Sequence, residues 1–252
     1  MKITVDGLSI YYEAQGQGQP VVLLHGWGVD SGSLRPLSNL LKNKAGARAI
    51  SVDLPGFGYS DPPPVDWDVS AYAAFLGHFL DCLGLDKVSL LGHSFGGRIA
   101  IKFAAQQPER VAKLVLVDSA GILPERGATY YYRVGVAKLV KWLKKALPFL
   151  KNSRLLPQLG SSDYQRAGAL RGTFVKVVNE DLRSYLPAIQ CPTLLIWGGK
   201  DHETPVSDAY LMKSLIPQAC LEVLPGAGHF PFQDNLAAFE SILPAFINEA
   251  CL

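Results

Sequence analysis

The sequence has few cysteines, the residues that form disulfides and many metal sites. It contains only four cysteines in 252 residues, Cys82, Cys191, Cys220 and Cys251, and no two of them have the short Cys-x-x-Cys spacing of zinc or redox sites. Scattered cysteines of this kind are typical of reduced packing residues in a cytoplasmic protein. We therefore expect a cytoplasmic location, no metal and no cofactor.

Long apolar runs and a strong charge of either sign are also missing. No apolar stretch approaches the roughly 20 residues that span a membrane, and the N-terminal Lys2–Val5 segment is typical of a strand rather than a signal peptide. The formal net charge of +2 gives no whole-chain basis for binding nucleic acid. With 48% hydrophobic and 18% charged residues, the composition predicts an ordinary soluble globular protein with material for a core.

The most informative segment present is Gly92–Gly97, between an apolar run at Val88–Leu91 and a helical pattern at Arg98–Ala105. Glycine two positions before and two positions after a serine, between a strand and a helix, is typical of a nucleophile elbow. Such a sharp turn strains the serine backbone and leaves no room for side chains at the flanking positions. We therefore predict that Ser94 is held out at the carboxyl end of a strand, with a helix N-terminus directed at it.

Apolar segments of strand length alternate with helical patterns along most of the chain. Strands are expected at Lys2–Val5, Leu8–Glu13, Val21–Leu24, Ala47–Leu54, Lys87–Leu91, Ala112–Asp118, Thr193–Trp197 and Leu221–Leu224. Helices are expected near Leu34–Lys42, Ser70–Leu83, 97–106, Val206–Leu215 and Leu236–Ala250. Near-continuous apolar strands between helices predict an α/β fold with a mostly parallel, doubly wound sheet covered on both faces.

One segment, residues 121–186, interrupts this alternation with helical patterns and no strand signal. Its clearest helix is Val134–Leu147, which has an apolar face and a basic face. The segment holds twelve of the 24 Lys and Arg residues but only four of the 22 Asp and Glu residues, so it is basic while the remainder is acidic. We therefore predict a core of residues 1–120 and 187–252, with residues 121–186 as a helical cap inserted after the strand ending near Asp118.

A serine nucleophile needs a general base, and that base needs a carboxylate to orient it. In this type of fold the partners follow the serine in the order acid and then histidine, each just after a later strand. Asp201 comes just after the expected strand at Thr193–Trp197, and His229 comes after the strand at Leu221–Leu224. Both the order and the placement are those of a catalytic triad.

The chain resembles the α/β-hydrolase family over essentially all of its 252 residues, the helical cap included. The motifs that carry the resemblance are His25-Gly26-Trp27-Gly28, the run from Asp53 to Ser60, the serine elbow, Trp197-Gly198-x-x-Asp201 and Gly226-x-Gly228-His229. The resemblance implies that Ser94 is the nucleophile, His229 the general base and Asp201 the orienting carboxylate. Asp118 is the alternative acid, because some family members supply the acid from that earlier strand.

An oxyanion hole requires two backbone N–H groups that converge on the developing alkoxide. One should be the N–H of Phe95, directly after the nucleophile, and the resemblance implies that the second is the N–H of Trp27. His25 is expected to support the oxyanion loop by hydrogen bonding, and His93 to order the elbow.

The identity of the nucleophile narrows the chemistry. The haloalkane dehalogenases and epoxide hydrolases that resemble this chain place aspartate at the elbow, so Ser94 argues against both. We expect a carboxylic ester hydrolase that acts on a small-molecule ester with a small to medium acyl chain. Three alternatives remain: an esterase for a methyl ester carried on a carrier protein, a serine-dependent C–C bond hydrolase, and a slow-turnover ligand receptor.

The basic face of the predicted cap helix carries Lys138, Lys141 and Lys145. Such a face is usually just solvated. Its alternative function is to dock an anionic partner, such as an acyl carrier protein or a lipid surface.

Overall fold

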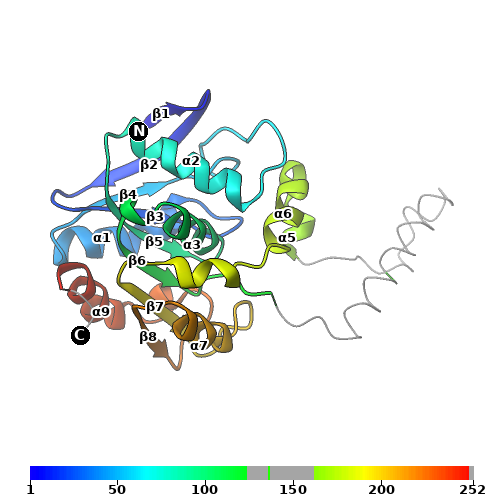
Figure 1. The fold of residues 1–252 in the computed structure, drawn as a ribbon. Helices are drawn as coiled ribbons and strands as arrows, with labels where there is room; N and C mark the ends of the chain where they lie inside the picture. Colours follow the sequence, from blue (N-terminus) through cyan, green and yellow to red (C-terminus); the bar gives the residue numbers. More distant parts are fainter. Residues whose placement is uncertain (124–135, 137–161, 250–252) are drawn as a thin grey trace.

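An eight-stranded sheet forms the centre of the computed structural model, which describes residues 1–123, 136 and 162–249 (Figure 1). The strands are β1 (Lys2–Val5), β2 (Leu8–Gln15), β3 (Pro20–Leu24), β4 (Arg48–Val52), β5 (Val88–His93), β6 (Val111–Val117), β7 (Thr193–Gly198) and β8 (Ala219–Leu224). They lie in the order β1-β2-β4-β3-β5-β6-β7-β8. The pairings β1–β2 and β2–β4 are antiparallel, and all the others are parallel, so the predicted mostly parallel sheet is confirmed.

Helices cover both faces of this sheet. The α-helices are α1 (Arg35–Lys44), α2 (Val69–Cys82), α3 (Phe95–Gln106), α5 (Ser162–Arg166), α6 (Arg171–Val178), α7 (Val206–Leu215), α8 (Pro231–Asp234) and α9 (Leu236–Asn248). Short 3-10 helices occur at η1 (Ser31–Leu34), η2 (Pro108–Arg110), η4 (Gly168–Leu170) and η5 (Arg183–Ala188). Apolar residues of α1 and α9 share one core layer with the sheet, and those of α2, α3 and α7 share the other.

The alternation of side chains along β3 explains why the central strands are apolar at every position. Val21 and Leu23 belong to the layer that holds α1 and α9, whereas Val22 and Leu24 belong to the layer that holds α2 and α3. All four side chains are fully buried. A strand covered on both faces cannot alternate between apolar and polar residues, which is the pattern expected for a parallel sheet.

Side-chain caps determine where two of the outer helices begin. The Asp68 carboxylate accepts a hydrogen bond from the Ala71 N–H at 2.9 Å ahead of α2, and Asn235 Oδ1 accepts one from the Ala238 N–H at 3.2 Å ahead of α9. Both helices therefore start within one residue of their expected first residue. The short helix α8 was not expected, and β8 begins two residues before the expected Leu221.

The described part of the segment between β6 and β7 is helical and is attached to the core. Thr173 Oγ1 in α6 accepts a hydrogen bond from the Trp67 N–H at 3.0 Å, and Lys176 Nζ donates to the Asp66 carbonyl at 2.6 Å. In Figure 1, α5 and α6 lie to the right of α2 and α3. The predicted cap helix at Val134–Leu147 and its three lysines lie outside the described residues, apart from position 136.

Within residues 1–123 and 162–249, no helix has both the length and the apolar character needed to cross a bilayer.

The largest fully buried side chain, Trp197 at the end of β7, provides a test of the core. Its indole N–H donates to the Thr204 carbonyl at 2.7 Å, so Trp197→Ala removes both packing and a buried hydrogen bond. We expect the free energy of unfolding to fall by about 3–5 kcal/mol in chemical denaturation. The control is Tyr210→Ala, because Tyr210 is 58% exposed and its loss should change stability by no more than about 0.5 kcal/mol. Equal effects of the two substitutions would contradict this account of the core.

Candidate active site

A strained turn between β5 and α3 presents the Ser94 side chain. The Ser94 backbone has φ 50° and ψ −111°, a region that side-chain-bearing residues rarely adopt. A Cβ on Gly96 would lie 2.1 Å from the Leu24 carbonyl oxygen, and one on Gly92 would lie 2.6 Å from the Gly96 oxygen. Glycine is therefore required at both positions, at Gly96 because the start of α3 packs against the end of β3 and at Gly92 because the start of α3 folds back over the end of β5.

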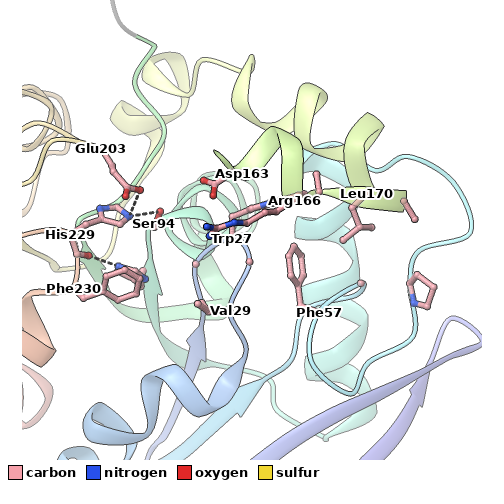
Figure 2. Close-up of a pocket in the computed structure, with 17 residues that line it drawn as sticks. Trp27, Val29, Phe57, Ser94, Asp163, Arg166, Leu170, Glu203, His229 and Phe230 are labelled. Atoms are coloured by element: carbon pink, nitrogen blue, oxygen red, sulfur yellow. Dashed lines mark hydrogen bonds and ion pairs between the residues drawn. The ribbon is translucent and has the colours of Figure 1, made fainter. Parts of the chain in front are cut away.

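The structure brings together Ser94, His229 and Asp201, which lie far apart in the sequence. The Ser94 hydroxyl is 3.0 Å from His229 Nε2, and His229 Nδ1 is 2.7 Å from Asp201 Oδ2. Ser94 follows β5, Asp201 follows β7 and His229 follows β8, so all three extend from carboxyl ends of parallel strands. Figure 2 shows the dashed contact between His229 and Ser94 at one end of a cavity.

The Asp201 carboxylate is held by more groups than the imidazole alone. Oδ1 accepts hydrogen bonds from the backbone N–H groups of Glu203 at 2.7 Å and Thr204 at 3.1 Å, and Oδ2 accepts one from Thr204 Oγ1 at 2.6 Å. Burial favours a raised pKa, but hydrogen bonds from His229 and Thr204 outweigh it and hold the pKa of Asp201 below its usual range. Asp201 is therefore ionised at neutral pH and fixed in direction.

Asp118, the alternative acid, occupies a different environment at the end of β6. It is fully buried, and its Oδ1 accepts a hydrogen bond from the Gly198 N–H at 2.9 Å. Its Oδ2 is enclosed and has no hydrogen-bond partner within the described part of the chain. Burial raises the pKa of Asp118 to about 9, and the nearby Asp201 charge adds to the rise. At neutral pH Asp118 therefore keeps its proton, while the imidazole of His229 bonds to Asp201.

Two further histidines link the loops around Ser94. His93 Nε2 donates to the His229 carbonyl at 2.7 Å, and burial lowers the pKa of His93 to about 3. His25 Nδ1 donates to the Gly26 carbonyl at 2.7 Å while its Nε2 accepts from the Leu54 N–H at 3.0 Å. Burial also lowers the pKa of His25. Both rings are neutral at pH 7 and act as fixed hydrogen-bonding groups.

The two residues expected to form the oxyanion hole lie on either side of the contact between β3 and α3. Phe95 is the first residue of α3, where a backbone N–H has no acceptor within the helix. Trp27 lies in the loop after β3, and its ring centroid is 5.3 Å from that of Phe95 and 5.0 Å from that of Phe174. The two side chains are in contact, and a Cβ on Gly26 would lie 3.5 Å from the Ser94 Cβ, so the loop after β3 lies beside the elbow. The role of the Phe95 and Trp27 backbone N–H groups as donors stays a prediction.

Two cavities meet at Ser94. The larger has a volume of about 580 Å³ and extends past Trp27 and Phe57 to α5 and η4, which contribute Arg166 and Leu170 (Figure 2). The smaller has a volume of about 190 Å³ and lies between α3 and α6. Ser94, His229, Trp27, Asp163 and Glu203 line both. Ser94 therefore has space for a substrate group on two sides.

Several residues of the site were not assigned from the sequence. Glu203 Oε2 lies 3.4 Å from His229 Nε2, and this carboxylate is 66% exposed. From α5, Asp163 lines both cavities and Arg166 lines the larger one, and no local pattern in the sequence could place them there. The Asp201–Thr204 spacing did contain a usable signal, since an aspartate often accepts hydrogen bonds from N–H groups two and three residues on. Among the described residues, no group of three or more histidine, cysteine or carboxylate side chains is placed to hold a metal ion.

The sequence and the structure are similar to those of known hydrolases. Residues 21–242 match the alpha/beta hydrolase family. The pimeloyl-[acyl-carrier protein] methyl ester esterase of Legionella pneumophila (strain Paris) is 30% identical over 95% of this chain and 100% of its own length. The 2-hydroxy-6-oxo-6-phenylhexa-2,4-dienoate hydrolase of Burkholderia cepacia is 29% identical over 97% of this chain and 94% of its own length. The crystallised esterase of Exiguobacterium antarcticum is 31% identical, with a TM-score of 0.77 over 98% of this chain and 99% of its own.

The buried Asp118 carboxyl should make stability depend on pH in a predictable direction. Its pKa is about 9 in the folded protein and roughly 3.9 in an unfolded chain, so its contribution to stability is complete below pH 4 and is lost as the pH rises toward 9. Asp118→Asn replaces a neutral acid with a neutral amide. We expect thermal denaturation at pH 8 to show a Tm at least roughly 2–4 °C above that of the parent protein. The difference in Tm between Asp118→Asn and the parent protein should shrink toward pH 4. A difference that stays constant with pH, or a variant that melts below the parent protein at pH 8, would contradict a neutral Asp118 carboxyl.

Proposed function

The chain belongs to the alpha/beta hydrolase family, and on this basis we propose that it hydrolyses carboxylic esters through an acyl-enzyme on Ser94. The observation that carries the proposal is the continuous hydrogen-bonded series from the Ser94 hydroxyl through the His229 imidazole to the Asp201 carboxylate, at 3.0 and 2.7 Å. A serine hydroxyl is a weak nucleophile at neutral pH, and this arrangement is the one that activates it.

In the first half of the proposed reaction, Ser94 Oγ attacks the ester carbonyl while His229 Nε2 takes its proton. Asp201 accepts the Nδ1–H, which fixes the tautomer that leaves Nε2 free to act as base, and its negative charge stabilises the imidazolium that forms. The hydrogen bonds from Glu203 and Thr204 keep this carboxylate ionised and prevent it from rotating. The carboxylate does not itself take the proton.

The negative charge that develops on the carbonyl oxygen is proposed to be stabilised by the backbone N–H groups of Phe95 and Trp27. Phe95 begins α3 and Trp27 follows β3, so the core would hold both groups in place before the reaction. When the tetrahedral intermediate collapses, His229 gives its proton to the leaving alcohol. A water molecule, activated by the same imidazole, then hydrolyses the acyl-enzyme.

The size of the site supports a small to medium substrate. The larger cavity, of about 580 Å³, has a volume typical of small-molecule sites, and the smaller one, of about 190 Å³, lies below that range. Both cavities adjoin the nucleophile. The Legionella relative is named for a methyl ester on a carrier protein and the Burkholderia relative for a dienoate. A carrier-linked ester or a C–C bond substrate is therefore the alternative to a free ester. The expected carrier dock at Lys138, Lys141 and Lys145 lies outside the described residues.

Hydrolysis of p-nitrophenyl esters from acetate to palmitate, with a vinylogous diketone alongside, tests the proposal. We expect turnover to be fastest for short to medium acyl chains and to fall by at least about 10⁴-fold in Ser94→Ala, because the nucleophile is lost. A fluorophosphonate should label the parent protein and not the variant. Labelling that persists in Ser94→Ala would remove Ser94 from the mechanism. Cleavage of the diketone in preference to all esters would favour the C–C alternative, and ligand-dependent melting shifts without turnover would favour a receptor.

Two conservative substitutions test which aspartate, Asp201 or Asp118, orients His229. Asp201→Asn should lower kcat by about 10⁴-fold, because an amide at this position favours the wrong His229 tautomer. Asp118→Asn should keep kcat within about tenfold of the parent value, because Asp118 already acts as a neutral group. The measurement is steady-state hydrolysis of the best p-nitrophenyl ester, with circular dichroism as a check on folding. The reverse pattern would assign the acid to Asp118.

A further inference from the structure

Arg98 is a buried cation beside the proposed nucleophile, Ser94. It has no role in the proposed hydrolysis. It lies in α3 one helical turn after Ser94, and it is only 6% exposed. Its side chain lines the smaller cavity together with Ser94. Because four residues advance a helix by about 6 Å, the guanidinium and the serine belong to the same short stretch of cavity wall.

Two of the hydrogen-bond donor groups of Arg98 are not used by the described residues. Its Nη1 donates to the Glu180 carbonyl at 2.7 Å. Its Nε and Nη2 have no hydrogen-bond partner among the described residues, yet neither nitrogen is enclosed by protein atoms. The cavity that Arg98 lines is the space available to them. Nε and Nη2 form the edge of a guanidinium that can bind both oxygens of a carboxylate.

The charges around Arg98 leave a positive excess. Lys102, one turn further along α3, has its side chain 4% exposed and forms an ion pair with the Glu180 carboxylate. The adjacent Asp181 forms its own ion pair with Arg183 at 3.2 Å. Glu180 thus serves both buried cations, Lys102 through its carboxylate and Arg98 through its backbone carbonyl. Burial lowers the pKa of Arg98 to about 10, with the charges of Glu180 and Asp181 opposing the change, so Arg98 stays charged at neutral pH.

The other residues that line the smaller cavity determine where in it the charge of Arg98 has the most effect. Phe174, Val177 and Val178 of α6 form an apolar side, where water screens a charge poorly. The acidic side chains Asp163 and Glu203 line both cavities, which places them at the junction, and Glu203 is largely exposed. Arg98 is the one cationic side chain among the described residues that line this cavity, so an anion is favoured beside Arg98 and disfavoured beside Asp163 and Glu203.

The geometry points to a substrate subsite: the smaller cavity binds the acyl chain of the ester, and Arg98 binds a carboxylate at the end of that chain. This inference rests on the proposed ester hydrolysis at Ser94 and names its substrate class, the half-esters of short dicarboxylic acids. A spacer of a few carbons, as in succinate or glutarate, suits a carboxylate one helical turn from the nucleophile.

A matched pair of substrates tests the subsite, namely mono-p-nitrophenyl glutarate and p-nitrophenyl pentanoate, which have acyl chains of equal length and differ in charge. The readout is the ratio of their kcat/KM values. We expect the parent enzyme to prefer the glutarate, and Arg98→Gln to lower the ratio by about tenfold to a hundredfold, the range of a charge-assisted hydrogen bond. Arg98→Lys should give an intermediate ratio. Arg166→Gln is the matched control, because Arg166 lines only the larger cavity and its loss should leave the ratio in place.

An unchanged ratio in Arg98→Gln would overturn the subsite while leaving ester hydrolysis intact, as would a ratio that falls only in Arg166→Gln. Binding measured without turnover guards against a poorly folded variant. Glutarate should raise the Tm of Ser94→Ala, and the increase should be absent when Arg98→Gln is added. An equal increase in both proteins would overturn the assignment. If no ester is hydrolysed by the parent but the Arg98-dependent increase occurs, the proposed function fails and the anion site stands.

Discussion

The close contact between the start of α3 and the end of β3 is the constraint on which the whole site depends. Gly96 packs against the Leu24 carbonyl with no room for a side chain, and this contact forces the chain at Ser94 into a strained conformation. Such a conformation costs on the order of 1–3 kcal/mol and persists only when its surroundings hold it. Backbone hydrogen bonds do so: the Ser94 N–H donates to Val117, and its carbonyl accepts from Gly97 and Ala120, all at 3.0–3.1 Å. The same contact brings the backbone of Phe95 beside the Trp27 loop.

Around this elbow, burial and hydrogen bonding give similar side chains different charges. Asp201 and Asp118 both follow parallel strands, but Asp201 receives three hydrogen bonds in addition to that of His229, whereas Asp118 has one enclosed oxygen without a partner among the described residues. The first is therefore ionised and the second neutral. Arg98 and Lys102, further along α3, both bind Glu180, Arg98 through the backbone carbonyl and Lys102 through the carboxylate. The carboxyl edge of the sheet thus combines one fixed negative charge with a positive charge that a substrate can neutralise.

Much of this arrangement is local in the sequence and could be predicted from it. The elbow glycines, the apolar strands and the placement of Asp201 and His229 after later strands follow from short-range patterns and from the geometry of a parallel sheet. Arg98 could not be assigned, because a helical arginine is usually exposed and its burial depends on Glu180, 82 residues further along. Likewise, no local pattern indicates that Arg166 reaches the cavity, and the choice between Asp118 and Asp201 depended on which carboxylate the imidazole meets.

The central claim is that Ser94 carries the acyl group during turnover. Mass spectrometry of acid-quenched protein, mixed with p-nitrophenyl butyrate and digested to peptides, tests it most directly. Acylation of Ser94 predicts a butyryl mass increment on the peptide that contains this residue, formed during a burst of p-nitrophenol release and lost as the ester is exhausted. His229→Ala should show neither the burst nor the increment. Rapid turnover with no acylated peptide, or with the acyl group on a different residue, would contradict the account.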